Sequence, residues 1–239
     1  MKNEEELKKN LIKDIEQEKC PLCSGTGWQL TKDNTYIQCD CIKLIRDREL
    51  FERSGINFKD IDKSFSTFVA WNDEVRSMKD IATSYYLNFS ENRGKRSNSI
   101  MFCGSPGSGK THLALALANN LMNKKNISVV YMSYRDVITK LKQNMVNESI
   151  YTSELEKYKN ADVLLIDDLF KGKISETDIN IVFEIINHRY LKYAPIIIST
   201  EMFTNGLLDV DEAIGSRLIE MSKSNLVEIR GRENNYRLR

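Results

Sequence analysis

The stretch GSPGSGKT constrains the fold more than any other part of this 239-residue chain. It satisfies the pattern G-x-x-x-x-G-K-[ST], and it stands between an apolar stretch typical of a strand and an alanine- and leucine-rich stretch typical of a helix. In that context the glycines let backbone N–H groups turn toward a phosphate at the positive end of the helix dipole. The sequence therefore predicts a nucleotide-binding loop made of Gly104, Ser105, Pro106, Gly107, Ser108, Gly109, Lys110, Thr111 and His112.

Two side chains of the loop carry its chemistry. The Lys110 ammonium is predicted to reach the β- and γ-phosphates of ATP, and the Thr111 hydroxyl is predicted to ligate Mg²⁺. A glycine turn that merely joins a strand to a helix would require neither residue in register.

The apolar stretch VLLIDDL, residues 163–169, ends in two adjacent aspartates. Carboxylates at the end of a buried strand are costly to desolvate unless a cation or a water network compensates. Asp167 is therefore predicted to hold Mg²⁺ and Asp168 to polarise an attacking water, which favours ATP hydrolysis. Solvated carboxylates at a strand end are the alternative.

Strand and helix patterns alternate from residue 99 onward, which predicts an α/β fold with a parallel sheet and helices on both faces. The expected strands are 99–103, 127–132, 162–167, 195–200 and one around 226–229, and the expected helices are 110–123, 134–144 and 176–192, with a polar insert after residue 144.

Two polar sites lie in the C-terminal part of this pattern, one at the end of the expected strand 195–200 and the other on a later helix. Ser199 and Thr200 end the stretch PIIIST, at the sheet edge where ligands bind, so Thr200 is predicted to sense the γ-phosphate or simply to end the strand. Arg217 falls on a predicted helix, either solvated or supplied to a neighbouring subunit as an arginine finger.

Four of the five cysteines lie between residues 20 and 41. The spacing C-x₂-C, fifteen residues, C-x-C offers four thiolates from two short loops, enough to close a tetrahedral Zn²⁺ site of the structural kind. Free buried thiols or a redox pair are the alternatives. The predicted ligands are Cys20, Cys23, Cys39 and Cys41, whereas Cys103 is expected to be a buried residue of a strand.

Residues 4–18, 42–55 and 73–90 have helical periodicity, and the boundary between two domains is placed after residue 55. Residues 1–55 are expected to form a partner-docking module that contains the zinc site, and residues 56–239 the ATPase domain. A formal charge of +1 indicates no global attraction to nucleic acid or membrane. The charged start and the lack of a membrane-length apolar stretch predict a cytoplasmic protein.

The motifs at 104–111 and 163–168, together with Val182–Tyr190, PIIIST and IGSRLIEM, resemble the AAA+ ATPase of bacterial or phage helicase loaders of the DnaC/DnaI type. The resemblance runs from about Ile61 to the C-terminus. It implies that Arg217 is a finger for a neighbour's nucleotide, that the chain assembles into oligomers, and that its partners are the hexameric replicative helicase and single-stranded DNA. Glu201 departs from the asparagine common at its position and cannot donate to a phosphate.

Only 22 residues follow Arg217, too few for a helical lid, so a lidless module is expected. An IstB-like helper of a transposase shares that arrangement and is the alternative function, and a zinc-anchored adaptor that binds ATP without turnover is a third. Two sets of residues are candidates for DNA contact, although a solvated charged face explains them equally: Tyr134, Arg135, Lys140 and Lys142, and the arginines at 230, 232, 237 and 239.

Overall fold

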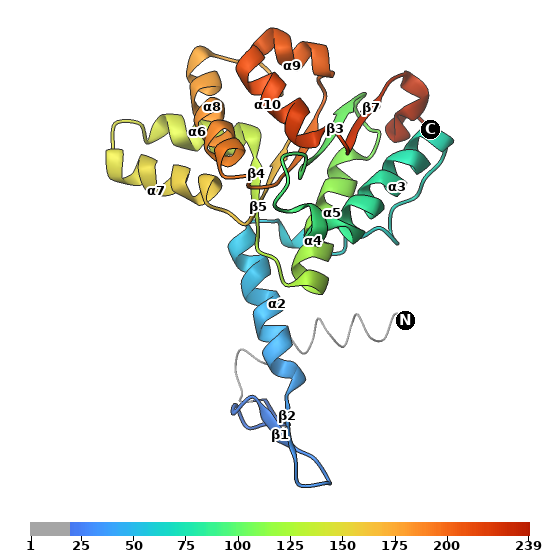
Figure 1. Cartoon of the computed structure of the whole chain (residues 1–239), viewed down its shortest axis with the longest axis vertical. Helices are drawn as coiled ribbons and strands as arrows, with labels where there is room; N and C mark the ends of the chain where they lie inside the picture. Colours follow the sequence, from blue (N-terminus) through green and yellow to red (C-terminus); the bar gives the residue numbers. More distant parts are fainter. Residues whose placement is uncertain (1–19) are drawn as a thin grey trace. The chain divides into compact units, whose positions relative to one another are not determined.

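The computed structural model describes residues 20–239, so the predicted helix over 4–18 lies outside the described residues. The chain divides into two compact units, Met1–Arg53 and Ser54–Arg239. Each unit is described by itself below (Figure 1).

The smaller unit contains a β-hairpin and the first described helix. Strands β1 (Trp28–Leu30) and β2 (Tyr36–Gln38) pair antiparallel. Helix α2 (Asp40–Ser54) begins two residues before the predicted start. In the hairpin register Leu30 lies opposite Tyr36, so these two side chains share one face of the hairpin. Trp28 lies on the same face, because successive residues of a strand alternate between faces.

The larger unit is built on a five-stranded parallel sheet with the order β4-β5-β6-β3-β7. Its strands are β3 (Ile100–Gly104), β4 (Val129–Ser133), β5 (Val163–Asp167), β6 (Ile196–Thr200) and β7 (Leu226–Ile229). Every residue of β3, β5 and β6 is buried, as expected for strands covered on both faces. The predicted fold class is confirmed, and each strand lies within two residues of its predicted range.

Helices cover both faces of this sheet (Figure 1). The α-helices are α3 (Asp73–Leu87), α4 (Phe89–Asn92), α5 (Lys110–Lys125), α6 (Tyr134–Gln143), α7 (Glu148–Lys159), α8 (Glu176–Leu191), α9 (Thr204–Val210) and α10 (Glu212–Ser222). The 3₁₀ helices are η1 (Phe58–Asp60), η2 (Arg232–Asn234) and η3 (Tyr236–Leu238). No helix among residues 20–239 is long and apolar enough to cross a membrane.

Alternation along the strands assigns each residue to one face of the sheet. Leu164 and Ile166 of β5 pack in one apolar cluster with residues of α8 and α10. Successive strand residues point to opposite faces, so Asp167 faces the other side, where α5 packs against the strands.

The stretch after residue 144, predicted only as a polar insert, contains helix α7. The Asn147 side chain accepts a hydrogen bond from the Ile150 amide and so caps the first turn. Leu155 and Tyr158 are the buried residues of this helix, and Tyr151 packs partly against the same core. These three positions are four and three residues apart, which is helical spacing in an otherwise polar stretch.

Arg189 of α8 is fully buried and links this helix to the end of α7, to the residues before β5 and to the residue before β6. Its Nη1 donates to the carbonyl oxygens of Tyr158, Lys159 and Ala161 at 3.0, 3.1 and 2.8 Å, and Nη2 donates to that of Pro195 at 2.8 Å. Burial lowers its pKa to about 10, so the side chain stays cationic at neutral pH. The guanidinium thus satisfies carbonyl groups just before β5 and β6 begin.

We predict that Arg189→Met lowers the free energy of unfolding by roughly 3 kcal/mol, because four buried or partly buried carbonyls lose their donor. Urea denaturation followed by circular dichroism measures the change. Lys192→Met, an exposed site three residues away, is the control and should change stability by less than about 0.5 kcal/mol. Equal stabilities of the two variants would show that Arg189 does not hold these segments.

Candidate nucleotide site and metal centre

The glycine loop begins at the last residue of β3 and is packed closely on both sides. Gly107 has φ of +74° and Gly109 has φ of +89°. A Cβ at Gly107 would lie 2.0 Å from Oδ1 of Asn235, and a Cβ at Gly109 would lie 2.6 Å from the Phe68 ring. Only glycine fits these two positions, because both the backbone conformation and the available space exclude a side chain.

Lys110 occupies the inside of the loop. Its side chain is buried, and Nζ donates to the carbonyl oxygens of Gly104 and Ser105, each at 2.7 Å. Burial lowers the pKa of this ammonium group, because desolvation disfavours its charge. A buried cation held by neutral carbonyl groups gains strongly from a phosphate anion beside it.

Asp167 is the meeting point of three hydroxyl groups. Thr111 donates to Oδ1 at 2.8 Å, the Ser199 hydroxyl donates to the same oxygen, and the Tyr131 hydroxyl donates to Oδ2 at 3.1 Å. Burial raises the pKa of Asp167, and the hydrogen bonds from Ser199 and Thr111 oppose that rise. The carboxylate and the Thr111 hydroxyl lie together as hard oxygen donors, the type of ligand that Mg²⁺ prefers.

Asp168 lies beyond the strand in a different environment. Its φ of +56° turns the chain, and its amide donates to the Ser199 hydroxyl at 3.0 Å. Its Oδ2 accepts from the Lys171 ammonium at 2.9 Å, and Lys171 also pairs with Glu201 at 3.1 Å. The two adjacent aspartates therefore point in different directions, one to Thr111 and the other to Lys171.

Thr200 does not face Asp167, whereas Ser199 does. The Thr200 hydroxyl is fully buried, donates to the Leu169 carbonyl at 2.8 Å and accepts from the Met202 amide at 3.1 Å. Thr200 lies on the α8 side of the sheet, because successive strand residues alternate between faces. The Ser199 hydroxyl therefore lies beside Asp167, whereas the Thr200 hydroxyl holds the turn after β5.

A pocket of about 480 Å³ lies beside the loop, within the size range of small-ligand sites. Polar residues around it include Lys110, Thr111, Asp168 and Lys171, and aromatic residues include Phe68, Trp71 and Tyr236. His112 also lines it and packs edge-on against Phe68 at 5.2 Å between ring centroids. Burial lowers the pKa of His112, so this imidazole is neutral at physiological pH.

The segment 235–239 contributes Tyr236 to the lining of this pocket. The Tyr236 amide donates to the Gly107 carbonyl at 3.0 Å, and the Tyr236 ring lies 5.1 Å from the Trp71 ring. Arg237 lines the same pocket. In the sequence this segment stands out only for its basic residues, because nothing local in it signals a contact with a loop more than 100 residues earlier.

Arg217 lies on α10 and packs against α8. Its Nη1 donates to the Ala213 carbonyl at 2.7 Å, and its guanidinium lies 5.4 Å from the Phe183 ring and 5.3 Å from the Tyr190 ring. The side chain is partly exposed.

Tyr134, a candidate for DNA contact, is buried and packs edge-on against Phe170 at 5.6 Å, so that prediction is wrong. Lys140 and Lys142 form ion pairs on the helix surface, with Glu154 and Asp178.

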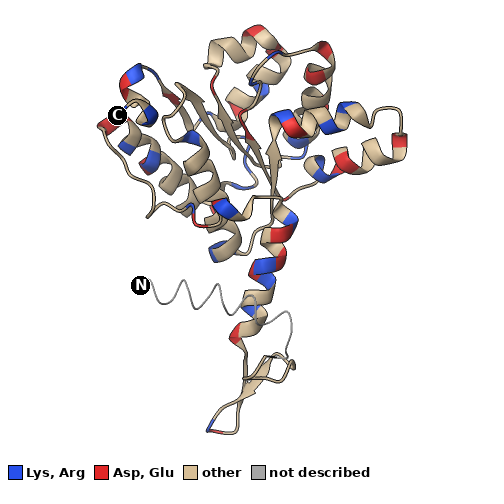
Figure 2. Ribbon diagram, turned by 180° about the vertical axis from the view of Figure 1, so that it is seen from behind, with Lys and Arg blue, Asp and Glu red and all other residues tan. Residues whose placement is uncertain are grey.

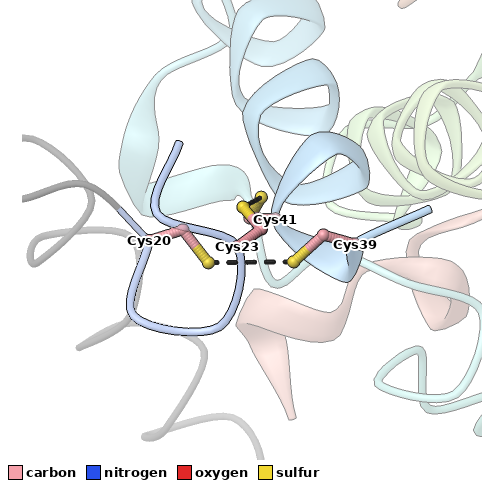
Figure 3. A group of neighbouring side chains, drawn as sticks. All are labelled: Cys20, Cys23, Cys39 and Cys41. Atoms are coloured by element: carbon pink, nitrogen blue, oxygen red, sulfur yellow. Dashed lines mark hydrogen bonds between the residues drawn. The ribbon is translucent and has the colours of Figure 1, made fainter. Parts of the chain in front are cut away.

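The four clustered cysteines of the smaller unit converge on one point (Figure 3). All four sulfur atoms lie within 4.8 Å of one another, with Cys20 and Cys39 3.7 Å apart and Cys23 and Cys41 3.5 Å apart. In a tetrahedral site with Zn–S bonds of about 2.3 Å the sulfurs stand about 3.8 Å apart. The cluster therefore has the ligand type and spacing of a structural zinc site.

Two N–H donors support thiolates in this cluster. The Gly27 amide donates to Cys23 Sγ at 3.3 Å, and Gln29 Nε2 donates to Cys39 Sγ at 2.8 Å. Burial tends to raise the pKa of Cys23, but the hydrogen bond from Gly27 and the neighbouring Cys41 outweigh it and lower the pKa to about 7. Cys103 is fully buried in β3, and burial raises its pKa to about 12, as expected for a residue of the core.

The parallel sheet, the loop around Lys110 and the polar edge at Asp167 define a P-loop ATP-binding module with the AAA+ arrangement. The profile of the family described as IstB-like ATP binding protein matches residues 47–239, and the chain belongs to that family.

Three comparisons place the chain among known proteins. It is 36% identical over 207 residues to the uncharacterized protein YqaM of Bacillus subtilis (strain 168), covering 84% of this chain and 65% of YqaM. It is 34% identical over 238 residues to the phage-like element PBSX protein XkdC of the same organism, covering 94% and 88%. The crystal structure of the DnaC helicase loader superimposes with a TM-score of 0.62 at 27% identity, covering 72% of this chain and 99% of that one.

We predict that the purified chain carries about one zinc ion per molecule and that Cys23→Ser loses most of it, because three thiolates no longer close the site. Mass-spectrometric metal analysis after gel filtration measures the content. Cys103→Ala is the matched control, since it removes the remaining cysteine without touching the cluster, and it should keep the metal. Unchanged zinc in Cys23→Ser would contradict the assignment.

Proposed function

We propose that this protein is an ATP-hydrolysing helicase loader that binds the hexameric replicative helicase and assists its placement on single-stranded DNA. The observation that carries the ATPase half is the convergence of Thr111, Ser199 and Tyr131 on Asp167 beside the buried Lys110. The helicase half is supported by the likeness to the DnaC helicase loader and by an exposed apolar face on the cysteine module.

The site residues divide the work of hydrolysis. Lys110 and the loop amides would bind the phosphates, and Thr111 and Asp167 would hold Mg²⁺, which would neutralise phosphate charge. Asp168 accepts a hydrogen bond from the attacking water and orients it. The water oxygen bonds to the γ-phosphorus, the bond from that phosphorus to the bridging oxygen breaks, and its electron pair leaves on ADP, while the water proton passes to solvent.

The hairpin of the smaller unit provides a surface for a protein partner. Trp28, Leu30 and Tyr36 share one of its faces and are 54%, 57% and 71% exposed, while Gln29 on the opposite face contacts the cysteine cluster. Single exposed apolar residues are common, but three adjacent large ones on a small module are typical of a docking site.

The charge of the module favours a protein partner over nucleic acid. Residues 20–41 contain one basic residue, Lys32, and the acidic Asp33 and Asp40, and a Zn²⁺ ion with four thiolates would add two negative charges. Figure 2 shows that charged residues are sparse on the hairpin and frequent on the helices. Binding to a phosphate backbone requires basic residues, so the hairpin face is suited to an apolar protein surface.

We predict that the double variant Trp28→Ser, Tyr36→Ser weakens binding to the hexameric replicative helicase of the same cell at least about 10-fold, because both rings leave the interface. Biolayer interferometry with purified helicase, with and without ATP, measures the affinity.

Leu87→Ser is the control for this experiment, because Leu87 is 65% exposed but belongs to the larger unit. Wild-type protein that binds no helicase but captures a transposase together with duplex DNA would instead support the helper function suggested by the IstB name of the family.

Arg217 is proposed to complete the nucleotide site of a neighbouring subunit. One of its N–H groups is bonded to its own helix, and Nε is buried without a hydrogen-bond partner among residues 20–239. The rest of the guanidinium is partly exposed and remains cationic, the requirement for stabilising charge on a transferring phosphoryl group.

We predict that Arg217→Ala and Asp168→Asn each abolish ATP hydrolysis, but that an equal mixture recovers about a quarter of the wild-type rate. In the mixture one interface in about four joins an intact Asp168 to an intact Arg217 from the next subunit. Phosphate release measures the rate, and ADP binding by each variant confirms its folding. A mixture as inactive as its components would contradict action between subunits.

A further inference from the structure

The loop that follows β5 carries Lys171, which has no role in the hydrolysis steps described above. Lys171 lines the same pocket as Lys110, Asp168 and Glu201, and its side chain is 38% exposed. Its ammonium donates to Asp168 at 2.9 Å and to Glu201 at 3.1 Å. Lys171 thus joins Asp168, the carboxylate proposed to orient water, to Glu201, the residue directly after β6.

The backbone fixes Lys171 in this place. The Leu169 amide donates to the Ser199 carbonyl at 2.9 Å, and the Leu169 carbonyl accepts from the Thr200 hydroxyl at 2.8 Å. Phe170, in a left-handed conformation with φ of +60°, is buried against Tyr134. The turn before Lys171 is therefore held by both β6 and α6. This fixes the backbone from which the Lys171 side chain reaches the pocket that Lys110 also lines.

The charges around Lys171 explain how Glu201 is tolerated beside a nucleotide. A glutamate alone at this edge would repel a γ-phosphate and has no proton to donate to it. Lys171 neutralises one of the two negative charges of Asp168 and Glu201 and presents an N–H donor to the pocket. An ammonium has three donors, and Asp168 and Glu201 use two of them in the described structure, so the third can bond to a phosphate before the bond to Asp168 is exchanged.

We propose that Lys171, oriented by Glu201, is the residue that senses the γ-phosphate of ATP. The inference deepens the proposed function and rests on it. When ATP binds, the terminal phosphate competes with Asp168 for the Lys171 ammonium, and a phosphate carrying more than one negative charge is the stronger acceptor. The exchange frees the Asp168 carboxylate to orient water only when a γ-phosphate is present.

Glu201 is a positioning residue in this arrangement. Its carboxylate stays bonded to Lys171 in both states and keeps the ammonium at the sheet edge, while Asp168 gives way. ADP lacks the γ-phosphate, so it leaves the pair between Lys171 and Asp168 intact. The Lys171 ammonium is therefore bonded to the γ-phosphate when ATP is bound and to Asp168 when ADP is bound, and this difference distinguishes the two nucleotides.

The test compares two nucleotides by isothermal titration calorimetry on the full chain. The non-hydrolysable analogue AMPPCP retains a terminal phosphate, and ADP does not. We expect Lys171→Met to weaken AMPPCP binding roughly 10-fold and ADP binding by no more than about 2-fold, since one charge-assisted contact is lost with the first ligand alone. Glu201→Gln should weaken AMPPCP binding roughly 3-fold and leave ADP unchanged.

Two further variants separate this role from a general loss of charge or fold. Lys173→Met removes an exposed positive charge two residues away and should change neither affinity. Lys171→Arg keeps the charge and should retain AMPPCP binding within about 3-fold of wild type.

Equal weakening of AMPPCP and ADP by Lys171→Met, or no weakening of either, would overturn the sensing role while leaving the ATPase proposal standing. Wild-type protein that binds neither nucleotide would refute the ATPase proposal itself.

Discussion

The buried carboxylate of Asp167 is the interaction on which the nucleotide site depends. It accepts hydrogen bonds from Thr111 at the start of α5, Ser199 at the end of β6 and Tyr131 in β4. A buried carboxylate is costly unless it is well bonded, so these three segments are held in one arrangement. The position of the phosphate loop relative to the sheet edge follows from that bonding.

The period of two along the strands separates structural from chemical roles at this edge. Ile166 and Ile198 are neighbours in the register of β5 and β6, so the residues that follow them, Asp167 and Ser199, lie side by side on the α5 face. Thr200 falls on the opposite face and fixes the turn that contains Leu169. The sheet edge thus uses one face to contact the ligand and the other to shape the loop.

Much of this arrangement is predictable from sequence, because the signals are local. The glycine loop, the paired aspartates and the cysteine spacing each occupy a short stretch, and apolar runs define the strands to within two residues. Which of Ser199 and Thr200 lies beside Asp167 depends on how β5 and β6 pair, and the stretch PIIIST alone does not reveal that. Helix α7 was missed because its apolar positions are few, and its core contacts are visible only after folding.

Other parts of the site depend on contacts between distant segments, which no single stretch of sequence reveals. Tyr131 reaches Asp167 from a neighbouring strand, and Lys171 forms an ion pair with Glu201, which lies 30 residues later in the chain. The sheet order β4-β5-β6-β3-β7 likewise arises from pairing between strands far apart in the chain. A pattern indicates which residues are able to do chemistry, and the fold decides which of them meet.

The contact of Asn235 and Tyr236 with the phosphate loop has a practical consequence for anyone who handles this protein. Asn235 packs on Gly107 and the Tyr236 amide bonds to the same residue, so a fusion partner or affinity tag attached after Arg239 would join a segment that contacts the phosphate loop. Nucleotide affinities measured on such a fusion would report the tag as well as the protein. A purification handle placed at the other end of the chain avoids that coupling.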